Sequence, residues 1–222
     1  MIGILTNVLS AATSICSTIG NALGSVGPFI SNMAKTISPY VDKVGTFLDI
    51  AGTLLKVFQP NDKAENFGEA MRQSSKKPDD FDDINSYIDH LRDEIKSGNI
   101  DLNIERSEED KLANKFMGYG LMLQGVNEKC DLTKGDIIIW GALCEKMGDN
   151  KITQDEAVSV IQNIGKSEIH SDDVSKYISG DKIESGANKS EISSIIENGL
   201  KDANPNMSSE EISAKFDELI KN

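Results

Sequence analysis

The residues best suited to hold a metal ion lie between Glu145 and Glu156, in the stretch EKMGDNKITQDE. Asp149, Asn150 and Glu156 carry the carboxylate and amide oxygens that a hard cation such as calcium prefers. The same stretch also has the spacing of a helix capping box, because Thr153 precedes Glu156 by three residues. It therefore has two interpretations, a cation-binding loop or a turn between two helices.

The core from Asp149 to Thr153, with the closing Glu156, resembles the second half of an EF-hand calcium loop. In that alignment Met147 falls at a ligand position but has no oxygen, and Asn150 stands where the loop uses glycine. We therefore favour the helix cap and predict no bound metal. Asp149, Asn150 and Glu156 are kept as calcium candidates.

Neither histidine predicts a zinc or catalytic site. His90 and His170 have no cysteine or second histidine at ligand spacing. The sequence shows no nucleophile motif and no glycine-rich phosphate loop after a strand. We expect no catalytic residue, no cofactor and no enzymatic activity.

The 222 residues carry a formal net charge of −13, which is unevenly distributed. Residues 1–58 hold three lysines and two aspartates, so the remainder carries −14. This balance argues against nucleic acid as a partner, because phosphate binding needs clustered lysine and arginine.

The chain has three cysteines, Cys16, Cys130 and Cys144, and no Cys-x-x-Cys pair. An odd number without such a pair argues against a framework of disulfides and favours synthesis in a reducing cytoplasm. The start lacks the basic region of a cleavable signal peptide, so any export or packaging would need a dedicated machine.

An apolar residue recurs at alternating steps of four and three through residues 1–58, the seam of a coiled coil or helical bundle. We call this series the seam. Its members are Leu5, Leu9, Ala12, Cys16, Ile19, Leu23, Val26, Ile30, Met33, Ile37, Tyr40, Val44, Phe47, Ala51, Leu54 and Phe58.

The positions beside the seam are mostly small or uncharged, so these helices lack a solvated face and should be enclosed by protein or lipid. Gly20, Gly24 and Gly27 predict close helix packing. In composition this start is similar to phage ejection proteins and secretion translocators.

The expected fold is all-α, with an apolar N-terminal hairpin or stalk followed by an acidic multi-helix domain. We place the apolar region at 1–59, with helices at about 3–25, 28–37 and 39–58 that turn or kink at Pro28 and Pro39. A linker follows at 60–82. The acidic domain, 83–222, should hold seven helices, at about 83–97, 107–124, 133–147, 153–164, 171–179, 188–198 and 208–221.

Two kinds of signal set these helix ends. Glycines mark the stops at Gly98, Gly125, Gly148, Gly165, Gly180 and Gly199. Capping pairs mark the starts, at Ser107 with Asp110, Thr133 with Asp136, Thr153 with Glu156, Asn188 with Glu191, and Ser208 with Glu211.

Three functions agree with this pattern. The first is a non-catalytic structural protein that associates with copies of itself, or docks into a filament, virion or secretion machine, through its N-terminal helices. The second is a membrane-inserting effector, translocator or pore former, for which a membrane is the partner. The third is a calcium-responsive binding module.

Overall fold

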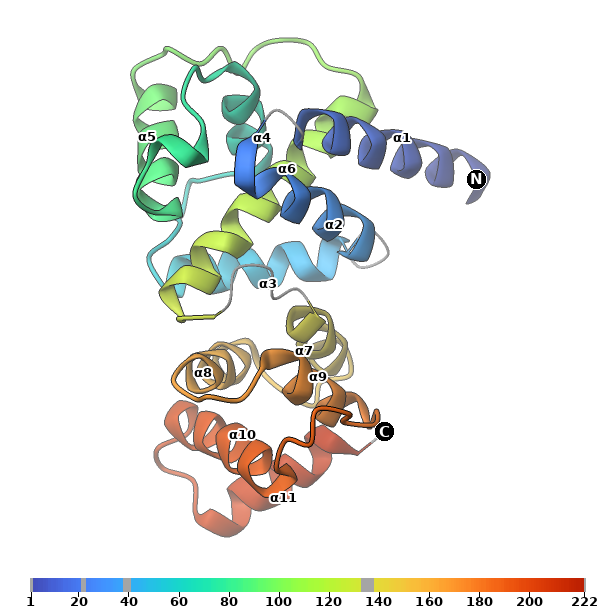
Figure 1. The fold of residues 1–222 in the computed structure, drawn as a ribbon, viewed down its shortest axis with the longest axis vertical. Helices are drawn as coiled ribbons and strands as arrows, with labels where there is room; N and C mark the ends of the chain where they lie inside the picture. Colours follow the sequence, from blue (N-terminus) through green and yellow to red (C-terminus); the bar gives the residue numbers. More distant parts are fainter. Residues whose placement is uncertain (1, 21–22, 38–40, 133–137, 222) are drawn as a thin grey trace. The chain divides into compact units, whose positions relative to one another are not determined.

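The protein is all-α, as its sequence predicts. The computed structural model describes residues 2–20, 23–37, 41–132 and 138–221, and within those ranges it holds eleven α-helices and no strand (Figure 1). The described side chains begin at Ser10, with short gaps elsewhere in the first fifty residues. Tyr40, Pro39 and the predicted cap of Thr133 with Asp136 lie outside the described residues.

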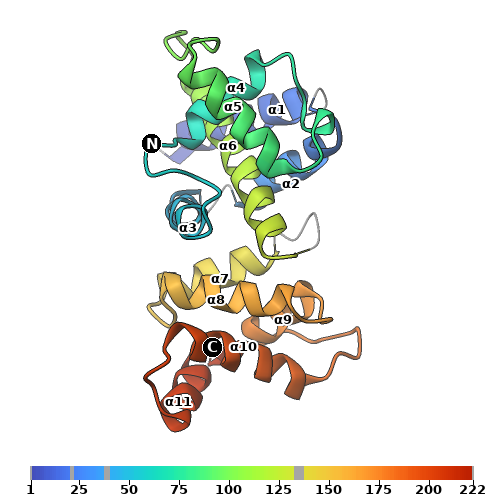
Figure 2. The ribbon, with the colours of Figure 1, turned by 90° about the vertical axis from the view of Figure 1, so that its left-hand side faces the viewer.

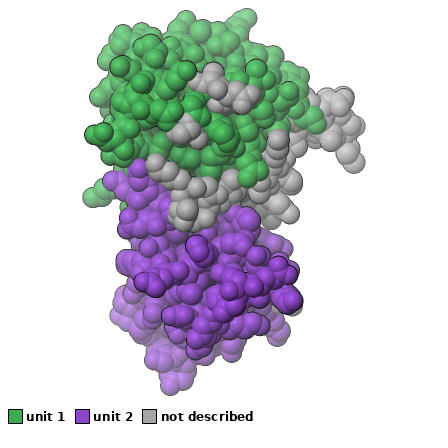
Figure 3. Space-filling view, viewed as in Figure 1, with its two compact units in different colours: residues 1–41, 52–126 green, residues 42–51, 127–222 purple. Residues whose placement is uncertain are grey.

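The chain divides into two compact units, and each takes in a piece of the predicted apolar region (Figure 3). Unit 1 consists of residues 1–41 and 52–126. Unit 2 consists of residues 42–51 and 127–222. The boundaries predicted at 59 and 82 both fall inside the second segment of unit 1, residues 52–126.

The N-terminal region forms three helices rather than one rod. They are α1 (Ile2–Gly20), α2 (Gly27–Ile37) and α3 (Val41–Leu54), with a short 3-10 turn, η1 (Gly24–Val26), before α2. Helix α1 ends earlier than predicted and packs against α2. Pro28 is the second residue of α2, where its missing amide hydrogen leaves no helical bond unmade.

The predicted linker is a packed part of unit 1. It contains α4 (Ala64–Gln73) and a 3-10 turn, η3 (Pro78–Asp80). Phe67, Ala70 and Met71 of α4 are buried, and the Phe67 ring lies 5.0 Å from that of Phe58. Helix α4 is buried on more than its apolar face, since Gly68 and Glu69 are covered as well.

The centre of unit 1 is α6 (Glu108–Lys129), which runs through the middle of the unit in both ribbon views (Figures 1 and 2). Helix α5 (Ile84–Lys96) lies in the same unit and buries Tyr87, Ile88 and Leu91.

Helices α4 and α6 approach each other through a reciprocal pair of glycines. A Cβ atom added to Gly68 would lie 1.9 Å from the carbonyl oxygen of Asn114. One added to Gly118 would lie 1.9 Å from the carbonyl oxygen of Ala64. Each helix therefore needs a residue without a side chain where the other backbone passes.

Unit 2 follows the predicted helix order closely. Its helices are α7 (Ile138–Gly148), α8 (Gln154–Gly165), α9 (Ser171–Ser179), α10 (Lys189–Ala203) and α11 (Ser209–Ile220). Reciprocal capping boxes are present at Thr153 and Ser208, and the Asn188 side chain accepts a hydrogen bond from the amide of Ser190. In unit 1, Ser107 likewise accepts from the amide of Asp110.

Two of the predicted glycine stops are wrong. Gly125 lies inside α6 and Gly199 lies inside α10. Both serve close packing, since a Cβ on Gly125 would lie 2.7 Å from a Val57 methyl group and one on Gly199 2.6 Å from Val160 Cα. A glycine in a helical sequence signals a close contact as readily as a helix end.

The core of unit 2 joins α8 to α10 and surrounds Trp140. Trp140 is fully buried, donates a hydrogen bond from Nε1 to Asn127 Oδ1 at 2.9 Å, and lies 5.1 Å from the ring of Phe47. Phe47 belongs to α3, so the N-terminal region contributes to this core as well as to unit 1.

Candidate functional site

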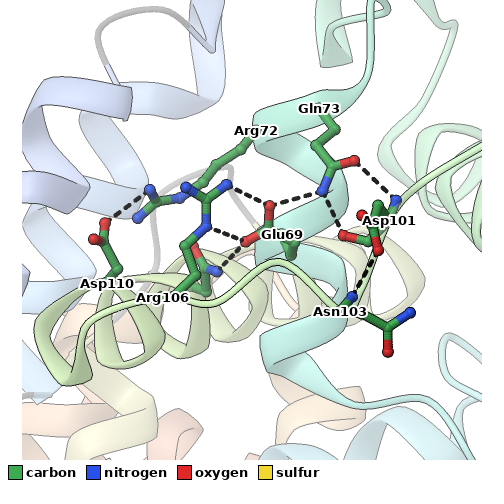
Figure 4. Close-up of polar contacts among 8 residues, drawn as sticks. Glu69, Arg72, Gln73, Asp101, Asn103, Arg106 and Asp110 are labelled. Carbon is green, nitrogen blue, oxygen red and sulfur yellow. Dashed lines mark hydrogen bonds and ion pairs between the residues drawn. The ribbon is translucent and has the colours of Figure 1, made fainter.

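A buried carboxylate on α4 organises the most elaborate polar cluster of unit 1 (Figure 4). Arg106 donates to both oxygens of Glu69, from Nη2 at 2.7 Å and from Nε at 3.0 Å. Gln73 and Asn114 donate to the same carboxylate at 2.7 and 2.8 Å. Gln73 also exchanges two hydrogen bonds with the backbone of Asp101, each 2.9 Å long. Glu69 therefore fixes the loop before α6 to α4.

The cluster holds Glu69 in its charged form. Burial raises the pKa of this carboxyl, but the hydrogen bonds from Arg106, Gln73 and Asn114 outweigh that effect and bring the pKa down to about 2. Breaking the cluster would leave a charge in a site that only these donors make tolerable.

One turn further along α4, Arg72 forms a second ion pair. Its Nη1 lies 2.8 Å from Asp110 Oδ1 in the first turn of α6. Burial raises the pKa of Asp110, and the bonds from Arg72 and Ser107 more than offset it, so the pKa is lowered. Nε and Nη2 of Arg72 are also buried, and neither has a hydrogen-bond partner among the described residues.

Arg72 and Arg106 line a cavity of unit 1 with a volume of about 530 Å³. Thr18, Ile19 and Leu23 form one wall, from the end of α1 and the turn after it. The other wall comes from α4 and the segment that follows it, and consists of Met71, Arg72, Ser74, Lys76 and Lys77, with Arg106 from the loop before α6.

Charge separates this cavity from the rest of the protein. Its described lining holds two arginines and two lysines and no acidic residue, in a chain with a net charge of −13. The lining also holds three apolar side chains and two hydroxyl groups. Such a surface can bind an anion, because arginine and lysine donate charge-assisted hydrogen bonds to carboxylates and phosphates.

Cys16 of α1 does not provide a nucleophile in this unit. Its side chain is fully buried, and burial raises the pKa of the thiol to about 12, although the charge of Arg72 lowers it in part. At neutral pH the group is a protonated thiol, whereas nucleophilic attack needs the thiolate.

Most of the described seam is enclosed by the chain itself. Two members behave differently, since Ile19 is partly exposed and Leu54 is 50% exposed. The buried members are Ala12, Cys16, Leu23, Val26, Ile30, Met33, Phe47, Ala51 and Phe58. These nine residues are covered within their own chain and are divided between the two units. The side chains of Leu5, Leu9, Ile37, Tyr40 and Val44 lie outside the description.

The three glycines predicted to serve helix packing do not share one helix. Gly20 ends α1, Gly24 lies in η1 with a φ of +69°, and Gly27 begins α2. A Cβ on Gly24 would lie 2.0 Å from Asp79 Oδ2, so Gly24 allows η1 to approach η3. The predicted Gly-x-x-x-Gly helix face is therefore corrected to a turn.

The calcium candidates do not form a site. Both oxygens of Glu156 are engaged, Oε2 by the Thr153 amide at 2.8 Å and Oε1 by Asn204 at 2.7 Å and Lys215 at 3.1 Å. Asp149 is exposed, and Asn150 has a φ of +58° at the end of α7. Across the described residues, no three His, Cys, Asp or Glu side chains are grouped to hold a metal. Glu156 is a helix cap.

Sequence analysis missed the cationic cavity because its charges come from separated segments. The one signal in the sequence was a cluster of three cations, Arg72, Lys76 and Lys77, in a stretch of six residues of an otherwise acidic chain. Arg106 follows about thirty residues later, and only the Glu69 cluster brings it alongside them.

None of the described helices is long and apolar enough to span a bilayer. Comparisons with models of protein families, with curated proteins and with solved structures found no match to this chain.

Proposed function

We propose that this protein is a non-catalytic assembly protein that associates with further copies of itself through the first two turns of α1. The observation that carries the proposal is how α1 is held in unit 1. Among its described side chains, which begin at Ser10, those of Ala12 and Cys16 are buried in the chain. Its first turns lie at the edge of unit 1 in both ribbon views (Figures 1 and 2).

The chemistry of α1 supports docking. Ile2–Gly20 contains no charged residue, so the helix has no strongly solvated face. The seam continues toward the N-terminus through Leu9 and Leu5, one helical turn apart. Apart from Ile19 and Leu54, the described later members of the seam are buried in their own chain, and we propose that a second copy covers Leu5 and Leu9.

The test is the mass of the purified full-length protein by light scattering across a range of concentrations. Wild type should form an oligomer. The double variant Leu5→Glu with Leu9→Glu should be a monomer, because a charge at each position would have to be desolvated in the interface.

The matched control is Ser10→Glu with Ser14→Glu, which adds the same two charges to α1 at exposed positions. It should assemble like wild type. A monomeric wild type, or loss of assembly in both variants, contradicts the proposal. Membrane insertion is favoured instead if the wild type is monomeric and makes lipid vesicles leak, and if the variant with Leu5→Glu and Leu9→Glu does not.

A further inference from the structure

We infer that the cavity of unit 1 is a binding site for an anionic amphiphile, a carboxylate or phosphate group attached to an apolar chain. This binding function is additional to assembly and uses other residues than Leu5 and Leu9. It would remain if the protein were a monomer.

The anionic part of the ligand follows from the charges in the lining. Arg106 forms an ion pair with Glu69, and Arg72 forms one with Asp110. Lys76 and Lys77 are exposed, and no carboxylate in the described chain pairs with either. The lining therefore carries two lysine side chains without an ion pair among the described residues, and the nearby Asp80 carboxylate accepts from the Lys77 backbone amide and not from its ammonium group.

The hydrogen-bonding state of Arg72 points the same way. A guanidinium group has five N–H donors in a fixed fork, and one ion pair uses only part of them. Nε and Nη2 of Arg72 are shielded from solvent and unbonded in the described structure. Buried donors of this kind are normally satisfied, and a shift of the Arg72 side chain toward the cavity would bring them to an oxyanion bound there.

The apolar part of the ligand follows from the opposite wall. Ile19, Leu23 and Met71 line the cavity together with the cations. A volume of about 530 Å³ lies within the range of small-molecule sites and exceeds what an isolated phosphate fills. A short alkyl chain would cover the apolar wall while its head group meets Arg72 and the lysines.

The test is calorimetric titration of the full-length protein with octyl phosphate, octanoate, inorganic phosphate and octanol, each kept below its aggregation concentration. Octyl phosphate or octanoate should bind at least tenfold more tightly than inorganic phosphate and than octanol. The stronger of the two identifies the head group. Failure of both to bind at millimolar concentration overturns the inference, as does equal binding of inorganic phosphate or of octanol.

The site is located with a pair of matched variants. Lys76→Gln with Lys77→Gln removes two lining charges from exposed positions and should weaken binding about tenfold. Lys63→Gln with Lys96→Gln removes two exposed lysines of unit 1 that do not line the cavity, and should leave binding unchanged. Equal affinities in the two variants place the ligand elsewhere and overturn the assignment.

Discussion

Each unit contains a glutamate that is almost fully buried and held by several donors, yet the two carboxylates are supported in different ways. Glu156 of unit 2 accepts from the amide of Thr153, three residues before it, and so caps its own helix, and it also accepts from Asn204 and Lys215 farther along the chain. Glu69 of unit 1 is held mainly by Arg106 and Asn114, which are 37 and 45 residues away. Glu156 therefore combines a local helix cap with two distant contacts, whereas Glu69 forms no cap and joins separate segments beside a cavity.

The remaining contacts extend this difference. In unit 1, Arg92 bonds Asp62 at 2.8 and 3.0 Å and the carbonyl oxygen of Val57 at 3.0 Å, again across more than 25 residues. Unit 2 relies on regular capped helices and on α8 packed against α10. The long-range ion pairs of Glu69 and Asp62 in unit 1 are made with arginine, whereas unit 2 combines capped helices with the contacts of Glu156 to Asn204 and Lys215.

The largest effect should come from the close contact between α4 and α6. Gly68→Ala places a methyl group against the backbone of α6, which cannot move aside as a flexible side chain would. We expect a loss of more than about 3 kcal/mol in the free energy of unfolding. Urea unfolding followed by far-UV circular dichroism measures it. A loss below 1 kcal/mol would mean that α4 and α6 can separate easily.

Removing the carboxylate of Glu69 should have the next largest effect on stability. Glu69→Gln leaves Arg106 without its counter-charge, and we expect a loss of about 3 kcal/mol at pH 7 from the lowered pKa. Trp140 is the only tryptophan and belongs to unit 2, so its fluorescence should shift less than the circular dichroism signal. The control is Glu65→Gln, an exposed position on the same helix, which should change neither signal.

The same carboxylate predicts how stability depends on pH. Its pKa in the folded protein is about 2, below the ordinary value near 4.5, so Glu69 stabilises the folded state above pH 4.5. That contribution, about 3 kcal/mol, should be lost as the pH falls from about 5 to 2. Unfolding measured at a series of pH values should give a flatter curve for Glu69→Gln. Parallel curves would show that Glu69 titrates normally.

A cap in unit 2 should matter less. Ser208→Ala removes the acceptor for the Glu211 amide and one half of a reciprocal capping box, with an expected loss of about 1 kcal/mol. Ser209→Ala at the next, exposed position is the matched control and should be nearly neutral. Both are measured by Trp140 fluorescence during urea unfolding. Equal losses would mean that the cap bond contributes nothing.

The smallest effect should be a gain. Gly141 lies inside α7, and a Cβ there would meet nothing within 4 Å in the described structure. Gly141→Ala should therefore stabilise the protein by about 0.5 kcal/mol, because alanine has the higher helix propensity. Thermal unfolding provides the measurement. A loss of stability would mean that the added methyl group meets a neighbour, as it does at Gly68, and that the position is not open.

Prediction from sequence succeeded where a structure depends on neighbours in the chain and failed where it depends on distant residues. The starts of α8, α10 and α11 lie within one residue of their predicted positions, because Thr153, Asn188 and Ser208 act on amides two or three residues away. The seam was also visible, and nine of its residues are buried. Neither signal identified what covers the seam, since that depends on residues far along the chain.

By itself the sequence determined the helical class, most helix ends and which residues must leave water, because these follow from propensity, capping and hydrophobic spacing over a few residues. The tertiary structure alone decided that Phe47 joins Trp140 while Met33 packs near Gly120, and so divided the seam between two units. It alone brought Arg106 beside Arg72 around a cavity. Such contacts join residues distant in sequence, and nothing in the local chain specifies which partner each will meet.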